Sequence, residues 1–243
     1  MKKLNSFQIK IILLILMLFD HIWSYFPNLF PSWIHAISRG VGPMFGYFLV
    51  EGFHYTSNKF KYGLRLFLFS IFMQLGNLLL NKLIISKNII ISNNIFFTLF
   101  ISFIIISLLD YIKNFKGFKK YILISINIFI STIGIFSTEG GFSVIPFVII
   151  TYYFKENSKK LFLGYFILSL TLFMIQGVQI YETFKETYEM FMFNSDFLLF
   201  LSIPFILLYN GERGLTNKFS KYLFYIFYPL HLWILILIKF FTK

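Results

Sequence analysis

Long apolar runs recur from one end of this chain to the other, and they limit the structures that it can form. The first reads IKIILLILMLFDHIWSYF, and similar runs follow at short intervals as far as residue 240. A helix needs about 20 predominantly apolar residues to span a bilayer, and only helices or closed barrels satisfy their backbone groups in lipid. The runs do not alternate apolar and polar residues as barrel strands do. The sequence therefore predicts an all-α, polytopic transmembrane helix bundle.

We place about nine spans, within a range of eight to ten, in a single domain that covers residues 1–243. The composition fits a membrane protein, because 58% of the residues are hydrophobic and 13% are charged. The predicted spans cover residues 8–26, 41–57, 62–81, 94–112, 119–136, 142–154, 161–181, 196–209 and 220–240.

The distribution of basic residues predicts the orientation. The net charge is +12, and the lysines fall in short loops between apolar runs, which is the usual topology signal and not a sign of a nucleic-acid partner. Sixteen of the 22 Lys and Arg residues fall on the side of the N-terminus, which we therefore expect to be cytoplasmic. The chain has no cysteine, which excludes disulfides, thiolate metal sites and a cysteine nucleophile.

The first predicted span carries two ionisable side chains, Asp20 and His21. Such groups are costly inside a membrane and usually face the bundle interior or a water-filled cavity. His21 lies 11 residues after Lys10, or roughly 16 Å along a helix and on the same face. Adjacent helical residues do not face each other, so either the helix is distorted and Asp20 and His21 form a dyad, or His21 has another carboxylate partner. His21 is either a general base or a hydrogen-bonding residue near the membrane interface.

The second predicted span combines glycines with two ionisable residues. Gly42 and Gly46 have the GxxxG spacing, which lets helices or a thin ligand chain approach closely. Glu51 and His54 are three residues apart and share a face. These glycines serve either tight helix packing or ligand binding, and Glu51 is either part of a structural hydrogen bond or a functional carboxylate.

Further candidates lie near the ends of other spans. The sequence YNGERG, which contains Asn210, Gly211 and Arg213, is a glycine-flanked turn of the kind that can wrap an anion. His231 follows a proline in YPLHL. Basic residues on the predicted cytoplasmic side either hold phosphates or only set topology and touch anionic lipid; they are Lys59, Lys61, Arg65, Arg213, Lys218 and Lys221.

The segment YETFKETYEMFMFNSD has acidic and aromatic residues on different faces, which is typical of an interfacial helix. The motifs GxxxxGK(S/T), HExxH and GxSxG are all missing from the sequence, and the spacing of its four histidines does not favour a metal site.

Several blocks of sequence together resemble the TraX family, which is named for a conjugation protein implicated in pilin acetylation. They are MLFDH, PMFGYFLVEGFHYT after Arg39, KYGLRLFLFS, NNIFFTL, YNGERG and KYLFYIFYPLHL, which run nearly end to end. Two segments, SRGVGP and STEGG, depart from the family pattern. A looser likeness reaches acyltransferase family 3, whose first helix has a basic residue, ten residues and then His. Lys10 and His21 match that spacing.

The resemblance implies an integral membrane acetyltransferase of the bacterial cytoplasmic membrane. It would use cytoplasmic acetyl-CoA and an acceptor amine or hydroxyl at the outer face, on a protein, glycan, lipid or peptide. His21, Asp20, Arg39 and Glu51 form the expected catalytic set. The residues expected to bind the donor are Lys10, Arg65, Arg213, Gly42, Gly46, Asn210, Gly211, Tyr228 and His231. The alternative is a proton-coupled transporter of a small solute, because intramembrane Asp, Glu and His also build proton relays.

Overall fold

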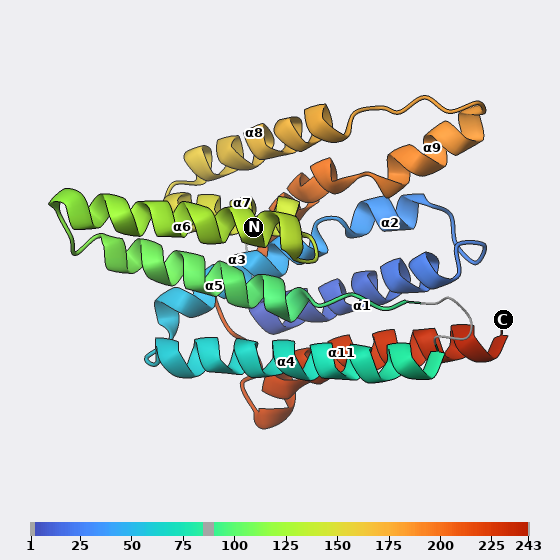
Figure 1. Ribbon diagram of the computed structural model, residues 1–243, viewed down its shortest axis with the longest axis horizontal. Coiled ribbons are helices and arrows are strands. Elements are labelled where there is room, and N and C mark those ends of the chain that lie inside the picture. The colour runs from blue at the N-terminus through green and yellow to red at the C-terminus, as the bar shows by residue number, and fades with distance from the viewer. Residues whose placement is uncertain (1–2, 85–89, 243) are drawn as a thin grey trace. The chain divides into compact units, whose positions relative to one another are not determined.

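A computed structural model describes residues 3–84 and 90–242, and within these ranges the chain is helical, with no strand (Figure 1). Lys2, Lys87 and Lys243, which enter the charge count, lie outside the described residues. The helices are α1 Ser6–Tyr25, α2 Trp33–Ser38, α3 Val41–Tyr55, α4 Lys59–Ile84, α5 Ile95–Ile112, α6 Gly117–Ser137, α7 Gly141–Phe154, α8 Ser158–Gln176, α9 Phe184–Phe193, η2 Asp196–Leu201, α10 Ser202–Leu208 and α11 Lys218–Thr242.

The all-α prediction is confirmed, and a helix occurs at each of the nine predicted positions, but nine membrane spans are not confirmed. Six helices among the described residues are long and apolar enough to cross a membrane: α1, α4, α5, α6, α8 and α11. A seventh span results if α9 and Asp196–Leu208, which are bent by 53°, count as one. The 14-residue α7 is only about 21 Å long, less than the roughly 30 Å hydrocarbon core.

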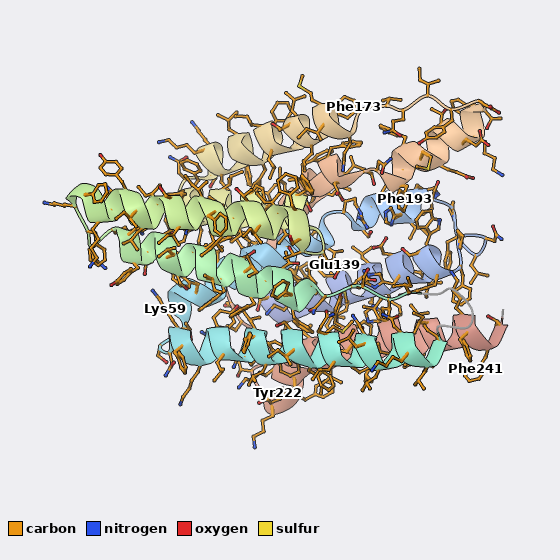
Figure 2. The ribbon with its side chains drawn as sticks, in the orientation of Figure 1. Lys59, Glu139, Phe173, Phe193, Tyr222 and Phe241 are labelled. Carbon is orange, nitrogen blue, oxygen red and sulfur yellow. The ribbon has the colours of Figure 1, made fainter. Side chains whose placement is uncertain are left out.

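Large apolar side chains are exposed along the long helices, and Figure 2 labels one of them, Phe241 of α11. Phe129 of α6 and Met174 of α8 are exposed as well. Water-soluble proteins rarely expose large contiguous apolar patches. The exposed side chains therefore support a multi-pass membrane protein.

The chain forms two compact units, which are described separately. The first unit comprises residues 1–44, 75–92 and 169–243. In it, α1 packs against α2 and α11, and α2 also packs against α9 and η2. Asn5 caps α1 reciprocally with Gln8, because each side chain accepts the other residue's backbone N–H at 3.0 Å. Ile9 and Leu13 of α1 are fully buried, so one face of α1 lies in the core of this unit.

The second unit comprises residues 45–74 and 93–168, in which α5 packs against α6 and α7. Gly134 of α6 allows close packing, because a Cβ there would lie 2.7 Å from Ile101 and from Ile145. Asn127 of α6 donates to the backbone oxygen of Ile105 at 3.0 Å. Such interhelical hydrogen bonds and small-residue contacts are the usual means of helix association in lipid.

Candidate functional site

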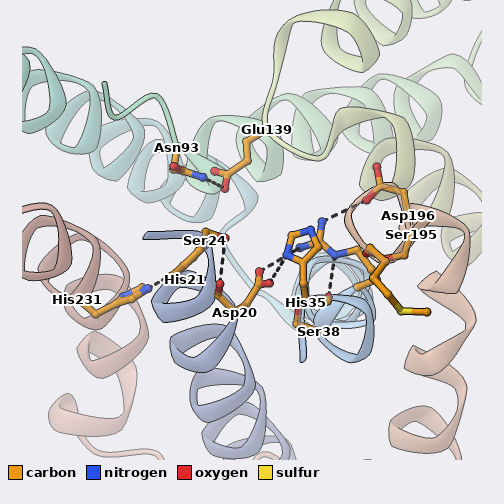
Figure 3. Close-up of polar contacts among 12 residues, drawn as sticks. Asp20, His21, Ser24, His35, Ser38, Asn93, Glu139, Ser195, Asp196 and His231 are labelled. Atoms are coloured by element: carbon orange, nitrogen blue, oxygen red, sulfur yellow. Dashed lines mark hydrogen bonds and ion pairs between the residues drawn. The ribbon is translucent and has the colours of Figure 1, made fainter. Parts of the chain in front are cut away.

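Asp20 is a buried carboxylate that joins α1 to α2 in the first unit. Its Oδ1 accepts a hydrogen bond from Nδ1 of His35 at 2.6 Å, and its Oδ2 accepts one from Nη2 of Arg39 at 3.0 Å (Figure 3). His35 lies on α2, and Arg39 follows four residues later, so both approach the carboxylate from one side of that short helix. Asp20 is thus fixed by two basic side chains, and His21 is not one of them.

Arg39 also binds a second carboxylate. Its Nη1 lies 3.3 Å from Oδ1 of Asp196 in η2, and Gln176 of α8 donates to Oδ2 of Asp196 at 3.3 Å. Gly40 allows this contact between α2 and η2, because a Cβ there would lie 2.9 Å from the backbone of Leu201. The guanidinium is therefore held between two carboxylates, which offsets much of the cost of burying these charges.

The His35 ring packs against two aromatic side chains that also lie close to each other. The Trp23 ring centroid of α1 lies 4.7 Å from it, and the Phe193 ring of α9 is stacked at 5.5 Å with an angle of 11°. These aromatic contacts and the hydrogen bond to Asp20 together fix the position of the ring.

His21 points away from Asp20 and pairs with His231 of α11. The distance between His21 Nδ1 and His231 Nε2 is 2.7 Å, and the two rings are stacked at 4.9 Å. His231 Nδ1 lies 2.7 Å from the backbone oxygen of Phe227, which can only accept a hydrogen bond. His231 Nδ1 therefore carries a proton. The edge of the Tyr228 ring also faces His21, with centroids 6.2 Å apart.

These two hydrogen bonds determine which nitrogen carries the proton in each ring when both rings are neutral. His231 donates from Nδ1, so its Nε2 accepts, and His21 must donate from its own Nδ1. His21 Nε2 is then left with an unprotonated lone pair. The arrangement gives His21 the form that a general base needs.

Lys10 and Arg213 come together at the N-terminal end of α1. The loop after α10 folds back onto this end, since Asn210 donates its backbone N–H to Leu4 at 2.9 Å and Ser6 donates its hydroxyl to the Arg213 backbone oxygen at 3.0 Å. Arg213 and Lys10 interact as like charges. The Lys10 ammonium also lies 5.3 Å from the centroid of the Phe224 ring. Two cations placed together favour an anion as their partner.

The YNGERG turn already uses some of its own backbone donors. Gly211 has a φ of 87°, a conformation that favours glycine. The Glu212 N–H donates to Asn210 Oδ1 at 2.9 Å, and the Asn210 N–H is bonded to Leu4. The turn therefore contributes to an anion site mainly by placing the Arg213 side chain.

The second unit contains three other predicted site residues, Glu51, Arg65 and Gly46, which have local partners there, whereas Gly42 belongs to the first unit. Glu51 pairs with Lys155 at 2.5 Å, and the Arg65 guanidinium lies 5.5 Å from the Tyr62 ring centroid. A Cβ at Gly46 would lie 2.8 Å from Val148 of α7, so Gly46 allows close helix packing. Gly42 lies in the first turn of α3. Whether these residues bind a donor stays a prediction.

Sequence reasoning missed His35 and Asp196. The signal for His35 was its position four residues before Arg39, which puts both side chains on one helical face. Asp196 stands near the end of an acidic and aromatic segment, where nothing in the sequence distinguishes it from a surface carboxylate.

Exposed apolar helices around buried ionisable side chains define a multi-pass helical membrane protein with a polar site inside one of its units. The chain belongs to the TraX family, because the family model described as TraX protein matches residues 6–239. It is also similar to the probable fimbrial assembly protein FimC, serogroup H1, of Dichelobacter nodosus, with 26% identity over 98% of this chain and 97% of that protein. No solved structure matches the chain.

Proposed function

We propose that the chain is an integral membrane acetyltransferase that transfers an acetyl group from cytoplasmic acetyl-CoA to an amine or hydroxyl acceptor at the outer face. The proposal depends on two successive hydrogen bonds, from His231 to the Phe227 backbone oxygen and from His21 to His231. They leave Nε2 of His21 able to accept a proton. A neutral, oriented imidazole inside a membrane protein is suited to general-base catalysis.

The donor would bind at the other end of α1. Lys10 and Arg213 are cationic groups at the helix start, and Ser6–Tyr25 is one continuous helix. From Lys10 to His21 is roughly 16 Å along the axis, so a long, thin arm is needed to connect a phosphate held at one end to a thioester at the other. Coenzyme A has such an arm between its phosphates and its thioester.

His21 would act in both halves of the transfer. The acceptor nitrogen or oxygen forms a bond to the thioester carbonyl carbon while its proton moves to His21 Nε2. The C–S bond then breaks, and His21 returns that proton to the leaving thiolate, which restores the neutral ring. His231 holds the His21 ring in the required tautomer throughout. Atoms and charges balance without any further reactant.

The Asp20 cluster would position α1 and α2 and not transfer the proton. Arg39 contacts Asp20 and Asp196, so it stabilises carboxylates. Arg39 therefore does not stabilise the developing oxyanion in this proposal. Glu51 is paired with Lys155, and a direct role in transfer would require this ion pair to open.

The relatives support a proposal for the acceptor class. The family resemblance implies pilin acetylation, and the similar protein from Dichelobacter nodosus is named for fimbrial assembly. We therefore propose a pilus or fimbrial subunit as the first acceptor to test. The excess of basic residues on the N-terminal side supports a donor on the cytoplasmic face.

The first test measures the melting temperature of the purified full chain in detergent with and without acetyl-CoA and CoA. Arg213→Ala is expected to lose the stabilisation and His21→Ala to keep it. The exposed Lys185 provides a charge control for Arg213, as Lys185→Ala, and His54→Ala is the histidine control. Transfer of radiolabelled acetyl to a fimbrial subunit is then expected only from variants that retain His21. A wild-type protein that neither ligand stabilises would contradict the proposal.

A proton-coupled transporter is the second candidate. The His21–His231 contact and the Asp20–His35 contact are both hydrogen bonds between ionisable groups, and such pairs also build proton relays. Proton flux into vesicles that contain the chain, with no response to CoA, would favour the transporter over the acetyltransferase.

A further inference from the structure

The second unit carries an open apolar groove between α4 and α5 that the proposed acetyl transfer does not use. Its volume is about 540 Å³. Its walls include Phe60, Leu64 and Phe67 from α4 and Phe103, Leu108 and Tyr111 from α5. Gly63 brings the helices together, because a Cβ there would lie 2.6 Å from the Phe103 ring.

The groove offers little to a polar ligand. The hydroxyl of Ser107, which also lines it, donates to the Phe103 backbone oxygen at 2.7 Å and is therefore already used. A ligand with amide groups would leave them without partners along these walls, which is costly. A hydrocarbon chain has no such groups. From Phe60 to Phe67 the groove follows α4 for roughly 10 Å, which suits part of one acyl chain.

One end of this groove is basic. Lys59 and Lys61 flank Phe60 at the start of α4, and Lys113 follows Tyr111 at the end of α5. Figure 2 labels Lys59 at this end of α4. Asp110 pairs with two of these lysines, at 2.7 Å from Lys59 and 3.4 Å from Lys113. Three lysines and one carboxylate in these two helix ends leave a net positive charge.

The neighbouring side chains keep this end cationic. The Tyr152 hydroxyl, with Asp110, raises the pKa of Lys113 above its ordinary value. Tyr152 also donates to Asp110 at 3.0 Å, so part of the negative charge of Asp110 is already satisfied. Lys61 makes no ion pair with any described residue and remains available for an outside anion.

We propose that this groove binds an anionic phospholipid, with one acyl chain along α4 and α5 and the phosphate headgroup at Lys59, Lys61 and Lys113. Basic pockets between transmembrane helices bind such headgroups. A second copy of the chain or another apolar helix would fill the groove but would leave the basic end without a negative partner.

The headgroup must supply the selectivity. An acyl chain that moves from the bilayer into the groove leaves one apolar surrounding for another, so it gains little from burial. Each lysine near an anionic headgroup strengthens binding by roughly fivefold. Phosphatidylglycerol is therefore expected to bind more tightly than phosphatidylcholine with identical chains.

The test uses the full chain, purified in a nonionic detergent and stripped of lipid. Lipids bound per protein are counted by native mass spectrometry during titration with dioleoyl phosphatidylglycerol, dioleoyl phosphatidylcholine or glycerol 3-phosphate. Lys61→Gln is expected to weaken phosphatidylglycerol binding about fivefold and to leave phosphatidylcholine binding unchanged. Lys120→Gln is the matched control, since Lys120 is exposed and does not flank the groove.

A second pair of variants tests the hydrocarbon part. Leu64→Trp fills the groove and is expected to abolish the preference for phosphatidylglycerol. Leu68→Trp, one turn further along α4 on an exposed position outside the groove, is expected to keep it. Equal binding of the two lipids, or an unchanged preference in Leu64→Trp, would overturn the proposal. Glycerol 3-phosphate that binds as tightly as the lipid would also overturn it, because the site would then bind only an anion. A dimer that Leu64→Trp disrupts would overturn it as well, because a second copy of the chain would then occupy the groove.

Discussion

Replacing Arg39 with methionine is expected to destabilise the first unit strongly. Arg39 contacts Asp20 at 3.0 Å and Asp196 at 3.3 Å, and its side chain is 22% exposed. Methionine keeps most of the side-chain volume but leaves two carboxylates without their shared cation. Breaking a buried pair by removing one partner costs about 3–5 kcal/mol. Because Asp196 is partly exposed and can regain water, we expect about 3 kcal/mol, at the lower end of that range.

A double-mutant cycle separates the ion pair from lost packing. Asp20→Asn removes the charge that Arg39 neutralises, so the double variant is expected to recover part of the loss. The coupling energy is expected to lie at about 0.5–3 kcal/mol, as for other residues in contact. Reversible unfolding in mixed micelles, followed by circular dichroism, measures each free energy. The matched control is Lys185→Met, which breaks an exposed pair with Glu189 at 4.0 Å and should change stability by less than about 0.5 kcal/mol. A loss below about 1 kcal/mol for Arg39→Met, or additive effects with Asp20→Asn, would refute the ion-pair reasoning.

Three further outcomes are expected. His21→Ala should lower the rate of acetyl transfer by about 10²–10⁴-fold, the usual contribution of a general base, and a transfer assay at saturating acetyl-CoA measures it. His231→Phe keeps the ring volume but removes the acceptor for His21, so transfer should fall while the CoA-dependent melting shift persists; unchanged transfer would contradict the tautomer assignment. Gly76→Ala should destabilise the first unit by about 1–3 kcal/mol, because its Cβ would lie 2.0 Å from the Trp233 ring; a melting temperature equal to wild type would show that this ring moves freely.

Helix positions were predictable because the apolar runs are long and the breaks between them are polar or rich in glycine. Spans were harder to predict, because a run of apolar residues does not show whether a helix is long enough to cross. The α7 helix has 14 residues and is apolar throughout. Its length and apolarity are equally typical of a buried core helix. The α9 helix was recognisable because it places its acidic and aromatic residues on different faces.

The partners of the ionisable residues could not be read from the sequence. Asp20 contacts residues 15 and 19 positions away, and Arg39 also contacts Asp196, 157 positions away. Helical periodicity predicts only which way a side chain points on its own helix. It indicated that Asp20 and His21 pair only in a distorted helix, but the carboxylate partner expected otherwise for His21 was wrong, because the partner is His231. Likewise, the sequence did not show that Glu51 forms an ion pair with Lys155, 104 positions away.

The adjacency of Asp20 and His21 has a chemical consequence for the proposed base. Successive helical residues are separated by about 100° around the axis, so one side chain reaches α2 while the other reaches α11. Both oxygens of the Asp20 carboxylate contact His35 or Arg39. The carboxylate therefore does not accept a hydrogen bond from Nδ1 of His21. The Asp20 charge is balanced by Arg39, and His21 Nδ1 donates to His231 instead. A general base needs a neutral ring with an unprotonated nitrogen, and the contact with His231 leaves that nitrogen at Nε2 of His21.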